Sequence, residues 1–513
     1  DPALAEGLLP ASVQARMQVS PVPPIPYASA LQGLLDYPYG CVEQTTSRGW
    51  AALLLDQDNA RSLGMQGLDS GERAARLEGS FARLAALQNS SGHFSMWGGN
   101  DGSVPMLTPH VAEFLLRARQ GGFAVPGHVL DKALQRLKED LLGNSQQFYG
   151  QSHRDQLRIA YRAHAAYVLA RVNQAPLGTL RTMYDNELKQ AAGPLPAAYL
   201  GAALALQGDR TRGQAAMRQA LDSSATRGID LNDYGSAVRD RSLVLALALE
   251  HGLNGNSTLA MEVSRELQAR AGDGRLWLST QEQIALARLG ERLVAGASER
   301  LSGQLLLAGE SQAVSGERLF SRVFDGAQLA SGISWQAGPA GRIYASYEVA
   351  GIPRQPPPFD ERHVRVQRQY FNPDGSRWAG GALREGQLLL ARVSITANRA
   401  MPEALLTELL PAGLELENLN LADPRQWADV RIDGVAVAER GEQASLRYEG
   451  FLDDRYVAAL RLSAGSTARV YYLLRAVSPG SYQVPPPLVE DMYRPQLRGV
   501  GKAEPASLEV VQP

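Results

Sequence analysis

Hydrophobic residues between about positions 28 and 297 recur at the three- and four-residue spacing of amphipathic helices. Glycine and proline separate these periodic segments, and counting the segments predicts about eleven or twelve helices joined in pairs. Helix pairs in series form either an open solenoid or a closed ring, and about twelve helices would close a ring of the α/α toroid type. Residues with this spacing include Leu77, Phe81 and Leu84; Val111, Phe114, Leu115 and Ala118; and Leu157, Tyr161, Ala165, Val168 and Val172.

After about residue 300 the pattern changes to alternating hydrophobic and polar positions, which predicts β-strands. Short strands separated by glycine and proline turns predict an antiparallel sandwich. The first 27 residues form an irregular, proline-rich lead with one expected strand at 13–19, and the stiff segment 353–358 is expected to be a domain linker. Strands are expected at 342–349, 364–367, 388–395, 444–448, 457–462, 470–475 and 508–511.

Composition and charge exclude several classes of protein. A chain of 513 residues with 44% hydrophobic and 20% charged residues predicts about two to four folded domains and not a disordered chain. The net charge of −2 gives no electrostatic basis for binding nucleic acid or an anionic membrane. No apolar run is long enough to span a bilayer. The chain begins at Asp1 without an initiator methionine or a signal-like segment, and we expect it to be a fragment of a larger protein.

The chain contains one cysteine, Cys41. A single cysteine excludes both an intramolecular disulfide framework and a thiolate zinc site. The sequence also lacks a Walker loop, the zinc motif H-E-x-x-H, the nucleophile motif G-x-S-x-G and a clustered set of His and Asp metal ligands, so we expect no cofactor and no metal. A lone cysteine is commonly just a small buried hydrophobic residue.

The residues around Cys41 favour a reactive role instead. Residues 37–44 read Tyr-Pro-Tyr-Gly-Cys-Val-Glu-Gln and precede a predicted helix at 45–55. Cys41 and Gln44 stand three residues apart where this helix begins, so the thiol and the carboxamide can meet on one helix face. A helix N-terminus also favours the thiolate needed for attack on a carbonyl. Displacement of ammonia from Gln44 by the Cys41 sulfur would give an internal β-cysteinyl–γ-glutamyl thioester.

The segment Gly40-Cys41-Val42-Glu43-Gln44 resembles the Gly-Cys-x-Glu-Gln thioester motif of the α2-macroglobulin and complement family, and the preceding Tyr-Pro-Tyr-Gly resembles its bacterial branch. Residues 88–98 and 277–283 resemble signatures of the family's thioester domain, and 410–415, 453–455 and 475–480 resemble its terminal macroglobulin domain. The resemblance implies an α6/α6 toroid thioester domain at 28–297, inserted in a CUB-like β-domain made of 1–27 and 298–355. Residues 360–513 would form a macroglobulin-like antiparallel β-sandwich.

A thioester is consumed by water unless bulky side chains keep water away from it. In bacterial relatives, a tyrosine upstream of the cysteine and a Met-Tyr pair from the last domain close over the thioester. Tyr37, Met492 and Tyr493 match those positions here, and Met492 and Tyr493 stand in a proline-framed segment, 485–495. The alternative is ordinary packing of these side chains at a domain contact.

The roles of Glu43 and of the histidines stay open at this point. Glu43 either tunes the local electric field or faces solvent in the first helical turn. In relatives that acylate hydroxyls, a histidine attacks the thioester and frees a thiolate base. His153 stands at roughly the right distance downstream of Cys41, although the residues around it match the family poorly, and His93 is the next choice. If neither serves, amines such as substrate lysines would attack directly.

The resemblance implies a broad-spectrum protease inhibitor that uses its acyl group once and is therefore not an enzyme. A protease would cut a bait region, the shield would open, and Gln44 would acylate the attacker, which protects the cell from host or competitor proteases. The implied partners are target proteases bound through Gln44, N-terminal macroglobulin domains of the parent chain and periplasmic helper proteins. Bacterial relatives are periplasmic, and many are tethered to the inner membrane by an N-terminal lipid, so any membrane contact is expected only through an anchor outside this chain.

Two other classes of protein remain open. An α/α-toroid carbohydrate-active enzyme with an appended β-domain would need paired carboxylates across a cleft. A scaffold or interaction module would carry the motif with an unformed thioester. The three hypotheses differ in mass, in thiol reactivity and in the response to methylamine.

Overall fold

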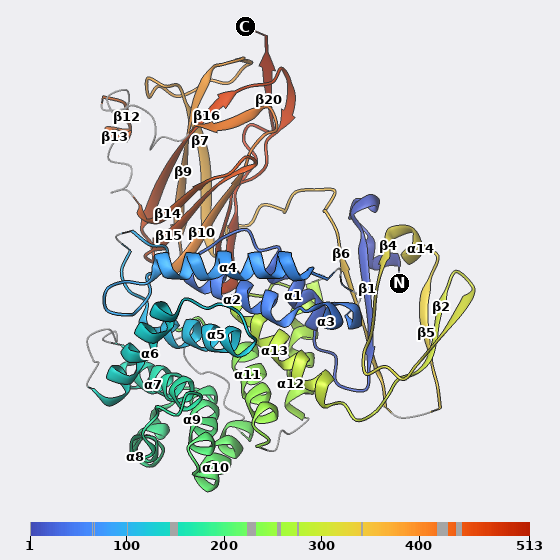
Figure 1. The fold of residues 1–513 in the computed structure, drawn as a ribbon. Helices are drawn as coiled ribbons and strands as arrows, with labels where there is room; N and C mark the ends of the chain where they lie inside the picture. The colour runs from blue at the N-terminus through green and yellow to red at the C-terminus, as the bar shows by residue number, and fades with distance from the viewer. Residues whose placement is uncertain are drawn as a thin grey trace. The chain divides into compact units, whose positions relative to one another are not determined.

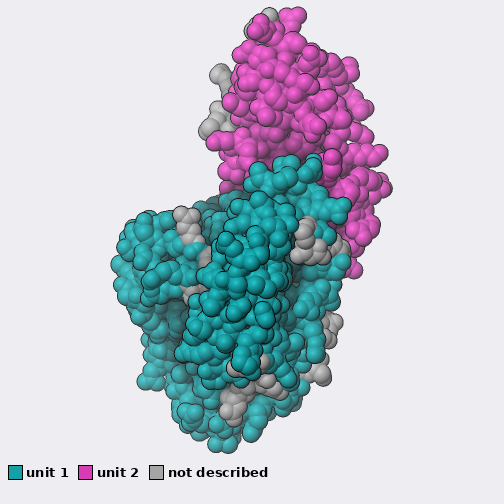
Figure 2. Space-filling view, turned by 90° about the vertical axis from the view of Figure 1, so that its right-hand side faces the viewer, with its two compact units in different colours: residues 1–354 teal, residues 355–513 magenta. Residues whose placement is uncertain are grey.

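The computed structural model divides into two compact units, residues 1–354 and residues 355–513 (Figure 2). The division falls inside the proline-rich segment 353–358. Each unit has a fold of its own (Figure 1). The structure describes residues 2–63, 65, 67–99, 101–143, 152–222, 232–253, 258–273, 276–339, 342–417, 429–437 and 444–512.

The helices of the first unit close into a ring. Among the described residues, six helices pack in the order α2, α5, α7, α9, α11 and α13, and α13 packs against α2 to complete the circle. The most apolar inner helix is α9, in which every residue from Leu195 to Leu204 is buried, as expected for a helix enclosed all round. The inner helices are α2 (Val42–Leu54), α5 (Thr108–Gln120), α7 (Arg154–Ala170), α9 (Leu195–Leu206), α11 (Ala237–Glu250) and α13 (Thr280–Gly296).

A second layer of helices surrounds this ring. Here only one face is apolar: α6 buries Val129, Leu130, Ala133, Leu134 and Leu137 at helical spacing. The closed double ring confirms the α/α toroid and excludes the open solenoid. The outer helices are α1 (Tyr27–Leu35) on α13, α4 (Ser70–Leu87) on α2, α6 (Gly127–Leu142) on α5, α8 (Leu177–Thr182) and α10 (Arg210–Leu221) on α9, and α12 (Thr258–Arg270) on α11, with the short α3 (Gln57–Ser62) following α2.

The toroid interrupts a β-domain within the same unit. Strand β1 (Gln14–Ser20), which precedes the helices, pairs antiparallel with β4 (Phe320–Asp325) and β6 (Tyr344–Ala350), which follow them. A second sheet has the order β3 (Glu310–Ser315), β2 (Ser302–Leu307), β5 (Ile333–Ala337), and α14 (Gly326–Ala330) follows β4. Met17 and Phe324 are among the fully buried residues of this domain. The insertion of the helical domain into a β-domain is thereby confirmed.

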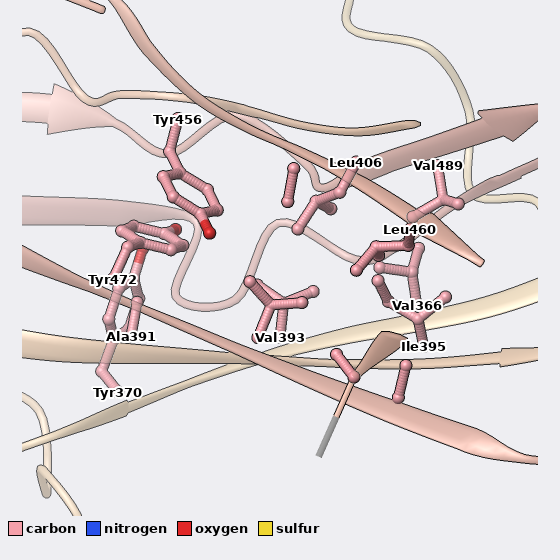
Figure 3. Close-up of a cluster of buried hydrophobic side chains, with 14 of the residues drawn as sticks. Val366, Tyr370, Ala391, Val393, Ile395, Leu406, Tyr456, Leu460, Tyr472 and Val489 are labelled. Carbon is pink, nitrogen blue, oxygen red and sulfur yellow. The ribbon is translucent and has the colours of Figure 1, made fainter. Parts of the chain in front are cut away.

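The second unit is an antiparallel β-sandwich, as predicted. One sheet has the order β14-β15-β10-β18-β19 and the other β11-β16-β9-β7, and a small sheet, β17-β20-β8, includes one parallel pair. The core between the sheets contains Val393, Leu406 and Tyr472 (Figure 3). The strands are β7 (Val364–Phe371), β8 (Leu383–Arg384), β9 (Leu388–Ala397), β10 (Met401–Leu409), β11 (Leu414–Glu417), β12 (Arg431–Ile432), β13 (Val435–Ala436), β14 (Ser445–Phe451), β15 (Arg455–Leu462), β16 (Thr467–Ala476), β17 (Gly480–Gln483), β18 (Leu488–Asp491), β19 (Arg494–Val500) and β20 (Ser507–Val511).

Candidate functional site

Cys41 and Gln44 meet at the N-terminus of the inner helix α2. Cys41 is the N-cap residue, and its Sγ accepts a hydrogen bond from the Gln44 backbone N–H at 3.4 Å. In return, Oε1 of Gln44 accepts from the Cys41 backbone N–H at 3.2 Å. Both residues are fully buried. This reciprocal capping box brings the two side chains together, as the three-residue spacing predicted.

The toroid explains why this helix end can be a reactive site. Along the chain an outer helix returns between successive inner helices, from α2 to α13, so the N-termini of the inner helices gather at one end of the ring. The free N–H groups there carry a partial positive charge of about half an elementary charge per helix. The end of the ring that holds Cys41 therefore favours negative charge, including the charge that develops when a thiolate attacks a carbonyl.

Hydrogen bonds tie the Cys41 turn to α4 and to the segment that follows it. The backbone N–H of Val42 donates to Met96 O at 2.8 Å, which ties the turn to the segment between α4 and α5. Arg83 donates to Gly40 O at 3.3 Å and to Trp97 O at 3.1 Å, so it joins the same two segments. The Cys41 turn is therefore bound to a segment whose own Met96 and Trp97 side chains are buried.

Tyr37 contacts the reactive pair directly. The side-chain amide of Gln44 donates to the Tyr37 hydroxyl at 3.2 Å, and the Tyr37 and Tyr39 rings pack edge to face with centroids 5.5 Å apart. Arg48 donates to Tyr37 O at 3.2 Å. Burial lowers the pKa of Arg48, and the charge of the neighbouring Cys41 opposes this only in part. Sequence reasoning placed Tyr37 here but missed Arg48 and Arg83.

Gly40 has no evident steric reason to be glycine. A Cβ at this position would lie 3.7 Å from Thr45 Oγ1 and 3.8 Å from the Arg48 guanidinium, which are ordinary contacts.

Glu43 does not face solvent, so that expectation is wrong. Its side chain is fully buried and accepts hydrogen bonds from Ser47 Oγ at 2.6 Å, Thr280 Oγ1 at 2.5 Å and Gln281 Nε2 at 2.8 Å. Thr280 and Gln281 lie in the first turn of α13, which packs against α2. The carboxylate therefore joins the N-termini of two inner helices. Solvent exposure was a plausible expectation because these partners are more than 230 residues away in sequence.

The structure shows His153 and His93 in different environments. His153 is exposed and forms the N-cap position of α7 with a left-handed backbone, φ 59°. His93 is buried, with Nδ1 2.9 Å from Thr108 Oγ1 and Nε2 3.5 Å from Asp140, and burial lowers its pKa. The role of His153 as a transfer base stays a prediction.

Met492 and Tyr493 belong to the second unit, where they form the two-residue tip between β18 and β19. Both side chains are buried. Asp491 holds the tip, because its Oδ1 accepts from the backbone N–H groups of Tyr493 at 3.1 Å and Arg494 at 3.0 Å. The segment that the sequence showed as framed by prolines thus forms a tight hairpin, with Met492 and Tyr493 at its tip.

The interior of the toroid offers little support for a carbohydrate-active site. A cavity of about 60 Å³ lies between α5, α7, α9, α11 and α13. Two carboxylates line it, but Arg239 bridges them, at 2.6 Å from Asp240 and 3.4 Å from Asp233. Carboxylates that share one guanidinium are poor candidates for a general acid and a nucleophile.

Metal binding and membrane crossing can be judged for the residues that the structure describes. No group of three or more His, Cys, Asp or Glu side chains is arranged to hold a metal ion there. No helix within the described ranges has the length and apolar character needed to cross a membrane.

Comparisons with known proteins agree on one family. Residues 364–496 match the family model of the bacterial alpha-2-macroglobulin MG10 domain. Alpha-2-macroglobulin of Xylella fastidiosa (strain Temecula1 / ATCC 700964) is 53% identical over 100% of this chain and 31% of the relative. Alpha-2-macroglobulin of Escherichia coli (strain K12) is 34% identical over 98% of this chain and 30% of the relative. The chain thus spans about a third of the length of these curated relatives.

Solved structures extend the similarity to the fold. Native alpha-2-macroglobulin from Escherichia coli, spanning the residues from domain MG7 to the C-terminus, matches with a TM-score of 0.89 at 32% identity, over 100% of this chain and 79% of that chain. Salmonella alpha-2-macroglobulin reacted with methylamine matches with a TM-score of 0.87 at 33% identity, over 100% of this chain and 32% of that chain.

Proposed function

The chain belongs to the bacterial alpha-2-macroglobulin family, and we propose that it carries the covalent trap of a protease inhibitor, an internal thioester between Cys41 and Gln44. The observation that carries the proposal is the capping box in which each of these two residues hydrogen-bonds the other at a buried helix N-terminus. We assign residues 28–297 to the thioester domain, 1–27 and 298–355 to a CUB-like domain, and 360–513 to the terminal macroglobulin-like domain.

This geometry supports a route to the thioester. The Cys41 sulfur attacks Cδ of Gln44, the Sγ–Cδ bond forms, the Cδ–Nε2 bond breaks, and the thiol proton leaves with Nε2 as ammonia. The Cys41 backbone N–H, 3.2 Å from Oε1, stabilises the negative charge that this oxygen gains during attack. The partial positive charge of the α2 N-terminus acts in the same direction.

The trapping step consumes the thioester. A lysine amine of the attacking protease adds to Cδ, the Sγ–Cδ bond breaks, one amine proton passes to the departing Cys41 thiolate, and an amide joins Gln44 to the protease. No turnover follows, so the protein inhibits and does not catalyse. Direct attack by an amine needs no histidine, and His153 would act as a base only if the target nucleophile were a hydroxyl.

The proposed trap also needs a shield around the thioester and a cellular location where proteases attack. Tyr37, Met492 and Tyr493 would exclude water from the thioester until a protease cuts the bait region of the parent protein. The partners would be the attacking proteases, the preceding macroglobulin domains and periplasmic helper proteins. The parent protein would work in the periplasm, held to the inner membrane by a lipid, and would protect the cell from host or competitor proteases.

The test uses the single cysteine as a reporter. The intact protein should be one ammonia lighter than its sequence mass, should hide its thiol from thiol reagents, and should release one thiol per chain on treatment with methylamine. Cys41→Ala should have its full sequence mass and release no thiol. A freely titrating thiol in fresh wild-type protein, without a methylamine response, would reject the thioester and favour the scaffold hypothesis.

A further inference from the structure

We propose that Thr280 and Gln281, at the start of α13, are positioning residues for the thioester because they hold the buried Glu43 carboxylate next to Gln44. The inference rests on the proposed thioester. Oε2 of Glu43 accepts from Thr280 Oγ1 at 2.5 Å, and Oε1 accepts from Gln281 Nε2 at 2.8 Å. Ser47, one turn further along α2, donates to Oε1 at 2.6 Å.

The three donors are neutral, and the Glu43 carboxylate is fully buried. Their hydrogen bonds to this carboxylate therefore help to fix the position of the first turn of α2. A buried carboxylate keeps its charge only if donors replace the lost water. Glu43 lies in the first turn of α2 and its partners lie in the first turn of α13, so both helix N-termini also stabilise the negative charge. Removal of one donor would weaken the hydrogen bonding that compensates for burial of the carboxylate, and the first turn of α2 would shift in response.

The start of α13 is itself rigid. Ser279 caps the helix and exchanges hydrogen bonds with Glu282, at 3.2 Å and 3.0 Å. The Gln281 amide has a second partner, because Nε2 lies 3.3 Å from His110 Nε2. Burial lowers the pKa of His110 to about 3, so this ring is neutral and its Nε2 can accept. One amide hydrogen therefore goes to Glu43 and the other to His110, which fixes the orientation of the amide.

A shift of Glu43 moves the reacting atoms because Gln44 is the next residue. The backbone N–H of Gln44 donates to Cys41 Sγ, and the side-chain oxygen of Gln44 accepts from the backbone N–H of Cys41. Displacement of reacting groups by about 1 Å can slow a reaction by about 100-fold. The two α13 residues thus act on the reaction through Glu43, without touching the sulfur or the carbonyl carbon.

The test compares Thr280→Val with Thr280→Ser. Newly made intact protein is acid-quenched at timed intervals, and its mass reports the fraction that has lost ammonia. Thr280→Val should form the thioester about 10- to 100-fold more slowly than wild type, and Thr280→Ser should restore the rate because it keeps the hydroxyl. Thr46→Val removes an equally buried hydroxyl from α2, one that donates to Val42 O and not to Glu43, and should leave the rate unchanged.

The outcomes separate this inference from the proposed function. If wild type never loses ammonia, the thioester proposal fails and the positioning role fails with it. If wild type forms the thioester and folded Thr280→Val forms it at the wild-type rate, the positioning role alone is overturned. Should Thr280→Val fail to fold, Gln281→Met replaces it, since the thioether keeps the side-chain length but donates no hydrogen bond; a wild-type rate in folded Gln281→Met would likewise overturn the role.

Discussion

Replacing Asp491 with alanine removes the carboxylate that organises the hairpin tip carrying Met492 and Tyr493. Asp491 is almost completely buried and uses both of its oxygens. Oδ1 accepts from the backbone N–H groups of Tyr493 and Arg494, and Oδ2 accepts from the Arg494 guanidinium at 2.6 Å. If the tip shields the thioester, its loosening should expose the thioester to nucleophiles.

The size of the effect follows from these contacts. Two backbone hydrogen bonds contribute about 1 kcal/mol each, and the partly buried ion pair with Arg494 contributes about another 1 kcal/mol. A loss of about 3 kcal/mol raises the population of the open tip by about 100-fold, since about 1.4 kcal/mol corresponds to a factor of ten. Reaction through the open tip should accelerate by up to the same factor. Tyr493→Gly, which removes one of the proposed shielding side chains, should also accelerate it.

The assay is the rate of thiol release from the intact protein in a fixed concentration of methylamine. Asp454→Ala is the matched control, because Asp454 also pairs with the arginine at the start of the next strand, Arg455, but lies exposed beside a different hairpin. The control should react at the wild-type rate. If Asp491→Ala reacted within about twofold of wild type while hydrogen exchange showed an opened tip, the shielding role of Met492 and Tyr493 would be refuted.

Two further predictions concern stability. Burial raises the pKa of Glu490 from 4.5 to about 7, so between these pH values the folded protein holds a proton that the unfolded chain releases. The free energy of unfolding should therefore fall by about 3 kcal/mol as the pH rises through this range. Urea titrations at pH 5 and pH 8 should show this loss in wild type but not in Glu490→Gln; equal pH dependence would contradict it. Glu113→Ala should lower the free energy of unfolding by about 3–5 kcal/mol, because it leaves buried Arg288 and His164 without their carboxylate. The surface change Glu72→Ala should cost less than about 1 kcal/mol in the same titration, and a similarly small loss for Glu113→Ala would argue against a buried charge network.

Local sequence patterns predicted the elements better than their boundaries. The hydrophobic spacing predicted helices that the structure confirms as α4, α5 and α7, and the alternation predicted β6, β7 and β9. The start of α2 was placed at Thr45, whereas the helix begins at Val42. The reason is that Cys41 caps it through sulfur, and cysteine is not among the residues that usually mark a helix start.

Closure of the ring was beyond the reach of periodicity. An open solenoid and a toroid have the same helix spacing, and what separates them is the packing of α13 against α2, across almost the whole helical region. The resemblance to a family, not the spacing, favoured the toroid. The burial of Glu43 has the same origin, since its partners Thr280 and Gln281 come from the last helix of the ring. The pairing of Cys41 with Gln44 was predictable because it depends on one helical turn.

For the proposed thioester, the magnitudes of two effects indicate which of them would drive its formation at this helix end. A helix N-terminus stabilises a negative charge by about 0.3–1 kcal/mol, whereas holding two reacting groups in place contributes about 7–11 kcal/mol. The buried carboxylate of Glu43, in the first turn of the same helix, opposes a thiolate at Cys41 and offsets part of the smaller term. Activation of the thiol by the helix is therefore the minor effect, and placement of Sγ against Cδ is the major one. The Glu43 carboxylate therefore favours the reaction on balance, because it fixes the first turn of α2. Its unfavourable effect on the Cys41 thiolate is the smaller of the two.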